Sequence, residues 1–265
     1  MNVFLFELKA YRKSTAIWVV SLLALIVLFL SMFPSFAKDV EDFQKLLESY
    51  PEAVRKAFGI EGDQFFSILG FYSYVFVYVA LCGAIQAMNV GISIVSKEMR
   101  EKAADFLMAK PISRTNILTA KLLAALTSFI ITNVIFIPAA LVVATLVKAE
   151  DFSVKIFLLL SIRLFFIQII FLALGTFMAI VLPKVKSVLA LSISTVFAFF
   201  IIGMLGSATD DEALRFLSPF QYFDSKYIME NISYEPAFMM TGFALIIILL
   251  VLSLIIYRKK DIHAV

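Results

Sequence analysis

Long apolar runs, separated by shorter polar segments, dominate the pattern of the chain. An α-helix rises 1.5 Å per residue, so about 20 apolar residues cross a hydrocarbon layer of roughly 30 Å. The runs also lack the alternation of a membrane β-barrel, whose strands take about ten residues each. They predict an all-α polytopic membrane protein with six spans, which we place at Ala16–Phe33, Phe71–Val95, Thr119–Val147, Val154–Leu182, Ser187–Leu205 and Ala237–Tyr257.

The composition strengthens this prediction. Of the 265 residues, 62% are hydrophobic, 28 are phenylalanine and only 16% are charged. A water-soluble fold of this size cannot cover so much apolar surface. In lipid that surface is an advantage, and helices satisfy every backbone amide within their own segment.

The charged residues predict an orientation. Lys and Arg near the ends of spans are retained on the cytoplasmic side. With the N-terminus inside, that side carries an excess of cations over acids, and the other side carries an excess of acids. We therefore expect both termini in the cytoplasm and the protein in the cell (plasma) membrane.

The polar segments divide a single membrane domain, residues 1–265, into parts with different expected positions. Residues 1–14 have apolar side chains at helical spacing and predict an interfacial elbow helix. Residues 35–69 form an outer loop with short amphipathic helices, either a lid on the membrane surface or a gate. Residues 206–236 form a second outer loop, aromatic and interrupted by Pro219, which suits an interfacial or re-entrant element.

The cytoplasmic segment 96–114 predicts a short amphipathic helix. Glu98 and Lys102 are four residues apart, while Met99, Ala103 and Phe106 share an apolar face. Such a helix can dock a soluble partner or lie on the lipid surface. The residue pattern alone favours neither.

Small and polar side chains mark the inside of several spans. Gly83, Ala87 and Gly91 recur every four residues, a spacing that lets two helices approach closely, within the core or between subunits. Amides are costly in hydrocarbon, so polar residues in spans are expected to face protein or a wet cavity. The resulting candidates for lining a transport pathway are Gln86, Asn89, Ser93, Gln168, Ser192 and Thr195.

Arg163 leaves two interpretations open. Counted within its span it carries a charge deep into hydrocarbon, which is costly. Alternatively residues 151–162 form an outer interfacial helix and the span starts near Leu164, with Arg163 reaching outward to the membrane surface. We favour the second interpretation.

Residues of several regions together resemble one known family. The segments are Tyr50–Gly59, Glu98–Lys102, Lys110–Arg114 with Lys121, Leu217–Pro219 and Arg258–Ile262, set among six spans with a basic amphipathic elbow. Over essentially its whole length the chain resembles the exporter-type (type-2) permeases of ATP-binding-cassette transporters. Ala103–Ala104 stand where that family often has Gly-Thr.

The resemblance implies a membrane subunit, not an enzyme, that works with a separate cytoplasmic ATPase and a second permease subunit. It also implies that Glu98, Arg100, Glu101 and Phe106 of a coupling helix contact that ATPase. None of the nine glycines is followed by Lys, so no P-loop motif is present, and ATP and magnesium are expected in the partner. We expect no metal, cofactor or catalytic residue in this chain; with His263 the only histidine, a multi-histidine metal site is excluded.

The chief alternative is an ATP-independent secondary transporter or an intramembrane enzyme. Ion-coupled carriers often place acidic residues at mid-membrane, whereas the six predicted spans contain no Asp or Glu. A membrane anchor or sensor would be favoured by a sizeable soluble domain. The substrate class cannot be read from the sequence.

Overall fold

The computed structural model describes residues 3–37, 40, 45–46, 49–57, 63–100, 114–182, 184–209 and 211–259. Six long helices account for most of these residues, and they are α1 (Val3–Leu30), α5 (Ile68–Arg100), α7 (Arg114–Val147), α8 (Val154–Val181), α9 (Val188–Thr209) and α12 (Pro236–Lys259). Short elements join them: α2 (Phe33–Phe36), α4 (Glu52–Ala57), η1 (Asp63–Phe66), α10 (Glu212–Leu217), η2 (Pro219–Gln221) and α11 (Ser225–Asn231). The described residues contain no strand.

The prediction of six spans in an all-α membrane protein is confirmed. Each long helix is long and apolar enough to cross a bilayer. The boundaries differ most at the N-terminus, where α1 starts at Val3, so the expected elbow segment and the first span share one helix. Likewise α5 continues past Val95 to Arg100.

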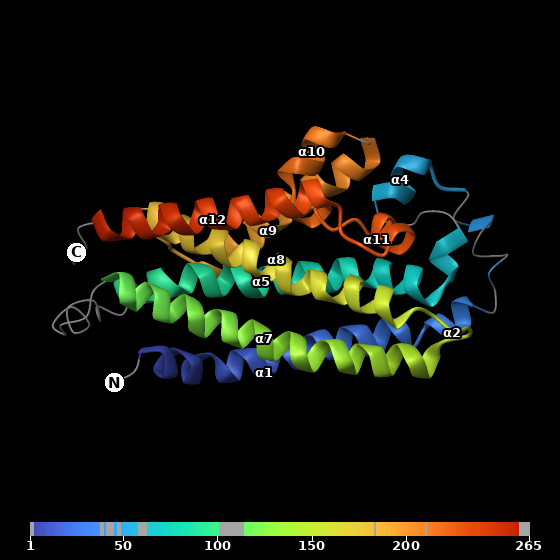
Figure 1. The fold of residues 1–265 in the computed structure, drawn as a ribbon, viewed down its shortest axis with the longest axis horizontal. Coiled ribbons are helices and arrows are strands. Elements are labelled where there is room, and N and C mark those ends of the chain that lie inside the picture. The colour runs from blue at the N-terminus through green and yellow to red at the C-terminus, as the bar shows by residue number, and fades with distance from the viewer. Residues whose placement is uncertain are drawn as a thin grey trace.

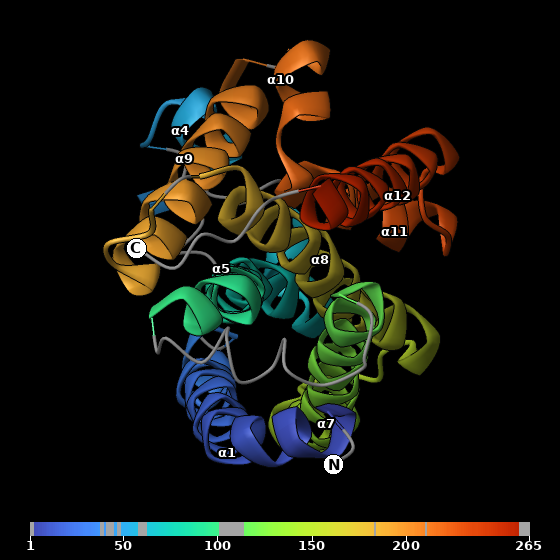
Figure 2. The same ribbon diagram turned by 90° about the vertical axis from the view of Figure 1, so that its left-hand side faces the viewer.

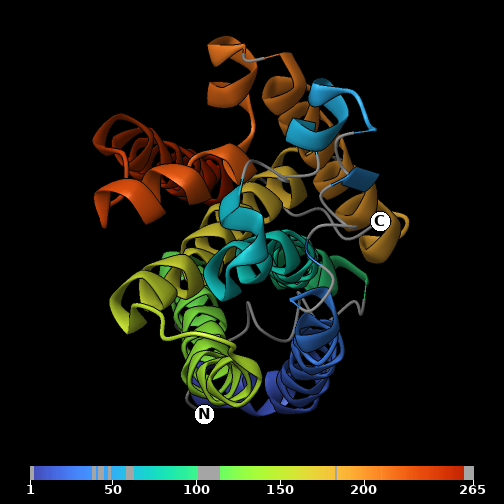
Figure 3. The ribbon, with the colours of Figure 1, turned by 90° about the vertical axis from the view of Figure 1, so that its right-hand side faces the viewer.

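The six helices pack as a central pair flanked on two sides (Figure 2). The pair is α5 and α8, whose long mutual contact forms the middle of the bundle. α1 and α7 pack together on one side, and α9 and α12 lie on the other (Figure 3). The central pair is mostly buried, while α9 and α12 leave most of their surface exposed, as helices that face lipid do.

The two ends of the bundle differ. At one end, called the terminal end here, α1 begins, α5 ends, α7 begins and α12 ends (Figure 1). Toward the other end lies a compact group of short elements, α10, η2 and α11. We call residues 211–235, which include these elements and their connections, the cap. The cap corresponds to most of the expected second outer loop.

The connection between α7 and α8 is short and lies at the end opposite to the termini. Ser153 caps α8, because its hydroxyl accepts a hydrogen bond from the backbone N–H of Ile156. Just before it, Lys148 forms an ion pair with the fully exposed Asp151 and holds the pKa of that carboxyl below its usual range. This short turn joins α7 to α8, and α8 then packs along α5.

Candidate functional site

Close contact between α5 and α8 depends on glycines. A Cβ atom at Gly91 would lie 2.6 Å from the carbonyl oxygen of Leu172, and one at Gly175 would lie 2.7 Å from that of Met88. Gly83 also faces α8, at the side chain of Leu164, and Ala87 is fully buried. The small residues singled out on the second span thus lie in the core of this chain.

Three side-chain amides form a buried chain between the central pair and α7. Gln168, near the middle of α8, donates from Nε2 to Oε1 of Gln86 on α5 at 3.0 Å. The Oε1 atom of Gln168 accepts a hydrogen bond from Nδ2 of Asn133 at 2.7 Å. All three side chains are buried, so this amide chain satisfies polar groups where water cannot reach them.

The other predicted pathway residues are not part of this amide chain. Asn89 and Ser93 are half-buried on the half of α5 nearer the terminal end. Ser192 is buried and its hydroxyl donates to the carbonyl of Val188, while Thr195 is half-buried and contacts the sulfur of Met178. The structure therefore pairs Gln86 with Gln168 and leaves Ser192 and Thr195 on α9, which packs against α5.

A charged contact joins three helices at the terminal end. The Nζ atom of Lys121 on α7 lies 3.6 Å from Oε1 of Glu7 on α1, and it donates to the carbonyl of Ile94 on α5 at 3.0 Å. Both side chains are buried. About two turns further along both helices, the hydroxyls of Thr15 and Ser128 share a hydrogen bond between α1 and α7. This group ties the start of α1 to both helices that flank segment 101–113.

The expected coupling residues lie mostly outside the described part of the chain. Glu101 and Phe106 lie outside the described residues, and so do the side chains of Glu98 and Arg100. The backbone of α5 is helical as far as Arg100. The coupling role of this segment stays a prediction.

Arg163 corrects the favoured interpretation of its position. α8 runs without a break from Val154 to Val181, and the Arg163 side chain is buried within protein rather than reaching outward. Its Nη1 donates to the carbonyl of Phe223 at 2.9 Å and to the hydroxyl of Ser225 at 2.6 Å, both in the cap. The charge is therefore placed within protein because the cap folds back over α8.

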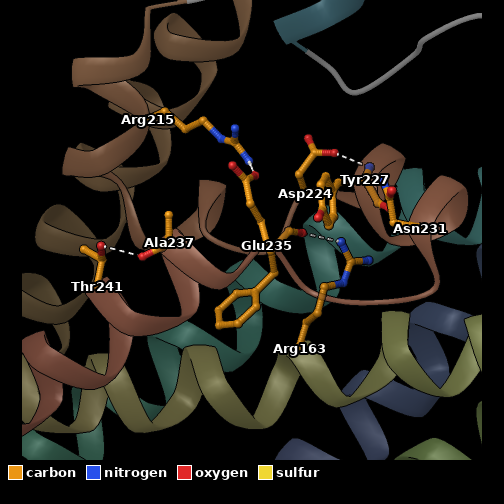
Figure 4. Close-up of polar contacts among 9 residues, drawn as sticks. Arg163, Arg215, Asp224, Tyr227, Asn231, Glu235, Ala237 and Thr241 are labelled. Atoms are coloured by element: carbon orange, nitrogen blue, oxygen red, sulfur yellow. Dashed lines mark hydrogen bonds and ion pairs between the residues drawn. The ribbon is translucent and has the colours of Figure 1, made fainter.

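The cap is held to its neighbours by further polar contacts. Ser218 donates to the carbonyl of Phe199, and Gln221 donates to that of Gly203, both on α9. Within the cap, Arg215 forms an ion pair with Glu235 at 2.5 Å (Figure 4). The sequence marked this region as aromatic, but it gave no signal for these long-range partners.

The chemistry of these sites is that of recognition and packing. Among the residues that the structure describes, no three His, Cys, Asp or Glu side chains gather as a metal site requires. The buried amides are neutral hydrogen-bonding groups that can orient a polar ligand or fix helix register.

A family model described as "Multidrug efflux system permease Rv1217c, C-terminal domain" matches residues 2–258. No curated protein matches the chain.

Proposed function

Because the chain belongs to this permease family, we propose that it is the membrane subunit of an ATP-binding-cassette exporter in the plasma membrane. The observation that carries the proposal is the match of residues 2–258 to an efflux permease family. The six apolar helices agree with that role. A separate cytoplasmic ATPase supplies ATP and magnesium chemistry, and a second permease subunit completes the pathway.

The proposed pathway follows the polar positions of α5 and its neighbours. Asn89 and Ser93 are one turn apart on α5, and Thr195 on the adjacent α9 is half-buried. Gln86 and Gln168 satisfy each other in this conformation and would meet a ligand only if α5 and α8 separate. Ser192 lines the same helix as Thr195 but is bonded to its own backbone.

The proposed ATPase contact is the cytoplasmic segment 96–114. Its two ends continue α5 and begin α7, the helices that Lys121 joins to α1. A push on this segment by a closing ATPase would therefore act on three helices together. Rigid movement of packed helices is the usual route by which a local push opens one side of a transporter.

The test is co-expression of the chain with an ATPase encoded beside it, followed by reconstitution in liposomes. We expect a stable complex whose ATP hydrolysis drives export and is abolished by vanadate. The double variant Glu98→Ala, Phe106→Ala should uncouple hydrolysis from transport. Lys184→Ala, an exposed residue between α8 and α9, is the matched control and should transport normally.

One result would reject the proposed function, and a second would reject only the proposed ATPase contact. The first is transport by the isolated chain that depends on an ion gradient and ignores ATP, which would indicate a secondary transporter. The second is a complex whose ATP-driven transport is the same in the double variant as in Lys184→Ala. That result would remove the coupling role of segment 96–114.

A further inference from the structure

Arg163 is a buried cation held by neutral acceptors. Its Nε donates to the carbonyl of Leu160 on its own helix at 2.8 Å. Its Nη1 donates across to the cap, to the carbonyl of Phe223 and the hydroxyl of Ser225. The guanidinium also lies 4.5 Å from the ring centre of Phe76 on α5, a cation–π contact. One side chain thus connects α8, α5 and the cap.

Arg163 forms no direct ion pair with a carboxylate among the described residues, although Asp224 lies near enough to act electrostatically on its charge. Asp224 is adjacent in sequence to both cap contacts, but its carboxylate turns away and accepts from the backbone N–H of Tyr227 at 2.6 Å (Figure 4). The Nη2 atom of Arg163 is buried and has no hydrogen-bond partner. Arginine here is therefore a costly choice for packing alone, since an apolar residue would fill the space without desolvating a charge.

A second contact joins the same two parts of the molecule. Tyr234, in the last residues of the cap, donates its hydroxyl to the carbonyl of Leu159 at 2.7 Å. Burial raises the pKa of Tyr234 to about 12, so the hydroxyl keeps the proton that it donates. Between these two polar contacts, the ring of Phe166 stacks on Phe223 and meets Tyr234 edge-on.

The cap also contacts α9 and α12. Ser218 and Gln221 fasten the cap to α9, and the guanidinium of Arg215 lies 3.9 Å from the ring centre of Phe238 on α12. The cap therefore bridges α8 on one side and α9 with α12 on the other. Any separation of α8 from α9 and α12 at this end must break one set of contacts.

We propose that Arg163 is a positioning residue that latches the cap onto α8 and is released when the permease opens at the cap end. This inference rests on the proposed transport function. The hydrogen bonds to Phe223 and Ser225 are the ones that break, because the guanidinium is fixed to α8 through Leu160 and to α5 through Phe76. Its unused Nη2 group offers a donor for water once the cap lifts, which lowers the barrier to release.

The test measures how often the cap leaves α8. Ile228 on α11 is fully buried, and α11 packs against α8. In a Cys82→Ser background, Ile228→Cys gives one reporter cysteine, and its reaction with a water-soluble maleimide is followed in nanodiscs. Adding Arg163→Gln should raise the labelling rate about tenfold, the factor that losing one hydrogen bond to a charged group implies.

Three further variants make the result decisive. Arg163→Lys keeps the charge but loses the planar fork of donors, so it should give an intermediate rate. Ser225→Ala removes one acceptor and leaves α8 untouched, so it reports the latch even if Arg163→Gln does not fold. Lys155→Gln removes an exposed charge from the same helix and should leave the rate unchanged. Equal rates in all of these variants would overturn the latch.

The complex with its ATPase separates this inference from the proposed function. Trapping the complex with a non-hydrolysable ATP analogue should raise labelling of Ile228→Cys in the background that retains Arg163. If ATP-driven transport is intact but neither nucleotide nor Arg163→Gln changes labelling, the latch is wrong and the transport function stands. If no ATP-linked transport exists yet Arg163→Gln exposes the cysteine, the cap contact stands and its role in transport is wrong.

Discussion

Gln168 donates a hydrogen bond from its Nε2 atom to Oε1 of Gln86, 3.0 Å away, in the middle of the helix bundle. Gln168 in turn accepts from Asn133, so the three amides run in one direction from α7 through α8 to α5. Oδ1 of Asn133 is buried and without a hydrogen-bond partner. The row of three amides thus has one unpaired acceptor, at its α7 end.

Gln168→Leu should destabilise the protein by about 1–3 kcal/mol, because it leaves the buried Oε1 of Gln86 without its donor. The double variant Gln86→Leu, Gln168→Leu should recover part of this loss, since it removes both partners together. Thermal unfolding in nanodiscs gives the comparison, with Asn89→Leu as the control amide on α5. A double variant less stable than Gln168→Leu would show that the two amides do not act as a pair.

Gly175→Ala should prevent normal packing of the central pair. Its Cβ would lie 2.7 Å from the carbonyl oxygen of Met88, so α5 and α8 must move apart, at a cost of about 1–3 kcal/mol or more. Gly242→Ala is the matched control, because the nearest atom to its Cβ is Tyr222 Cδ2 at 3.5 Å, an ordinary contact. The yield of monodisperse protein and its thermal midpoint should fall for Gly175→Ala and hold for the control.

Lys121→Met should cost more than the double variant Glu7→Gln, Lys121→Met. Removing only the cation leaves the buried Glu7 carboxylate without its partner in α7, and such a loss typically costs about 3–5 kcal/mol. Neutralising both residues avoids the uncompensated charge. The unfolding midpoints of the single and the double variant are compared. A double variant less stable than Lys121→Met would contradict a buried ion pair between α1 and α7.

The long helices could be predicted from the sequence because their signal is local. Hydropathy over about 20 residues placed the fourth span at Val154–Leu182, and α8 runs from Val154 to Val181. The short elements were harder. Helices of six or seven residues, such as α10 and α11, carry little local signal because their caps depend on single residues.

The partners of polar residues in the spans could not be predicted, because they depend on how helices pack. Gln86 and Gln168 were both singled out as costly in hydrocarbon, but their pairing requires the register that Gly91 and Gly175 impose on α5 and α8. Arg163 was expected to reach the membrane surface. Its actual acceptors, Phe223 and Ser225, lie about 60 residues away in a segment whose fold no local pattern reveals.

Arg215 offers the last prediction, as a contrast to Arg163. Its guanidinium pairs with Glu235 and lies 3.9 Å from the ring centre of Phe238, yet both charged side chains are about a quarter exposed. Solvent screens such a pair, so Arg215→Gln should cost only about 1 kcal/mol. Its effect should also shrink in high salt, whereas the effect of Arg163→Gln should not, because salt does not reach a buried cation. Unfolding midpoints of both variants at low and high salt test this difference, and an equal salt response would mean that water reaches Arg163 beneath the cap.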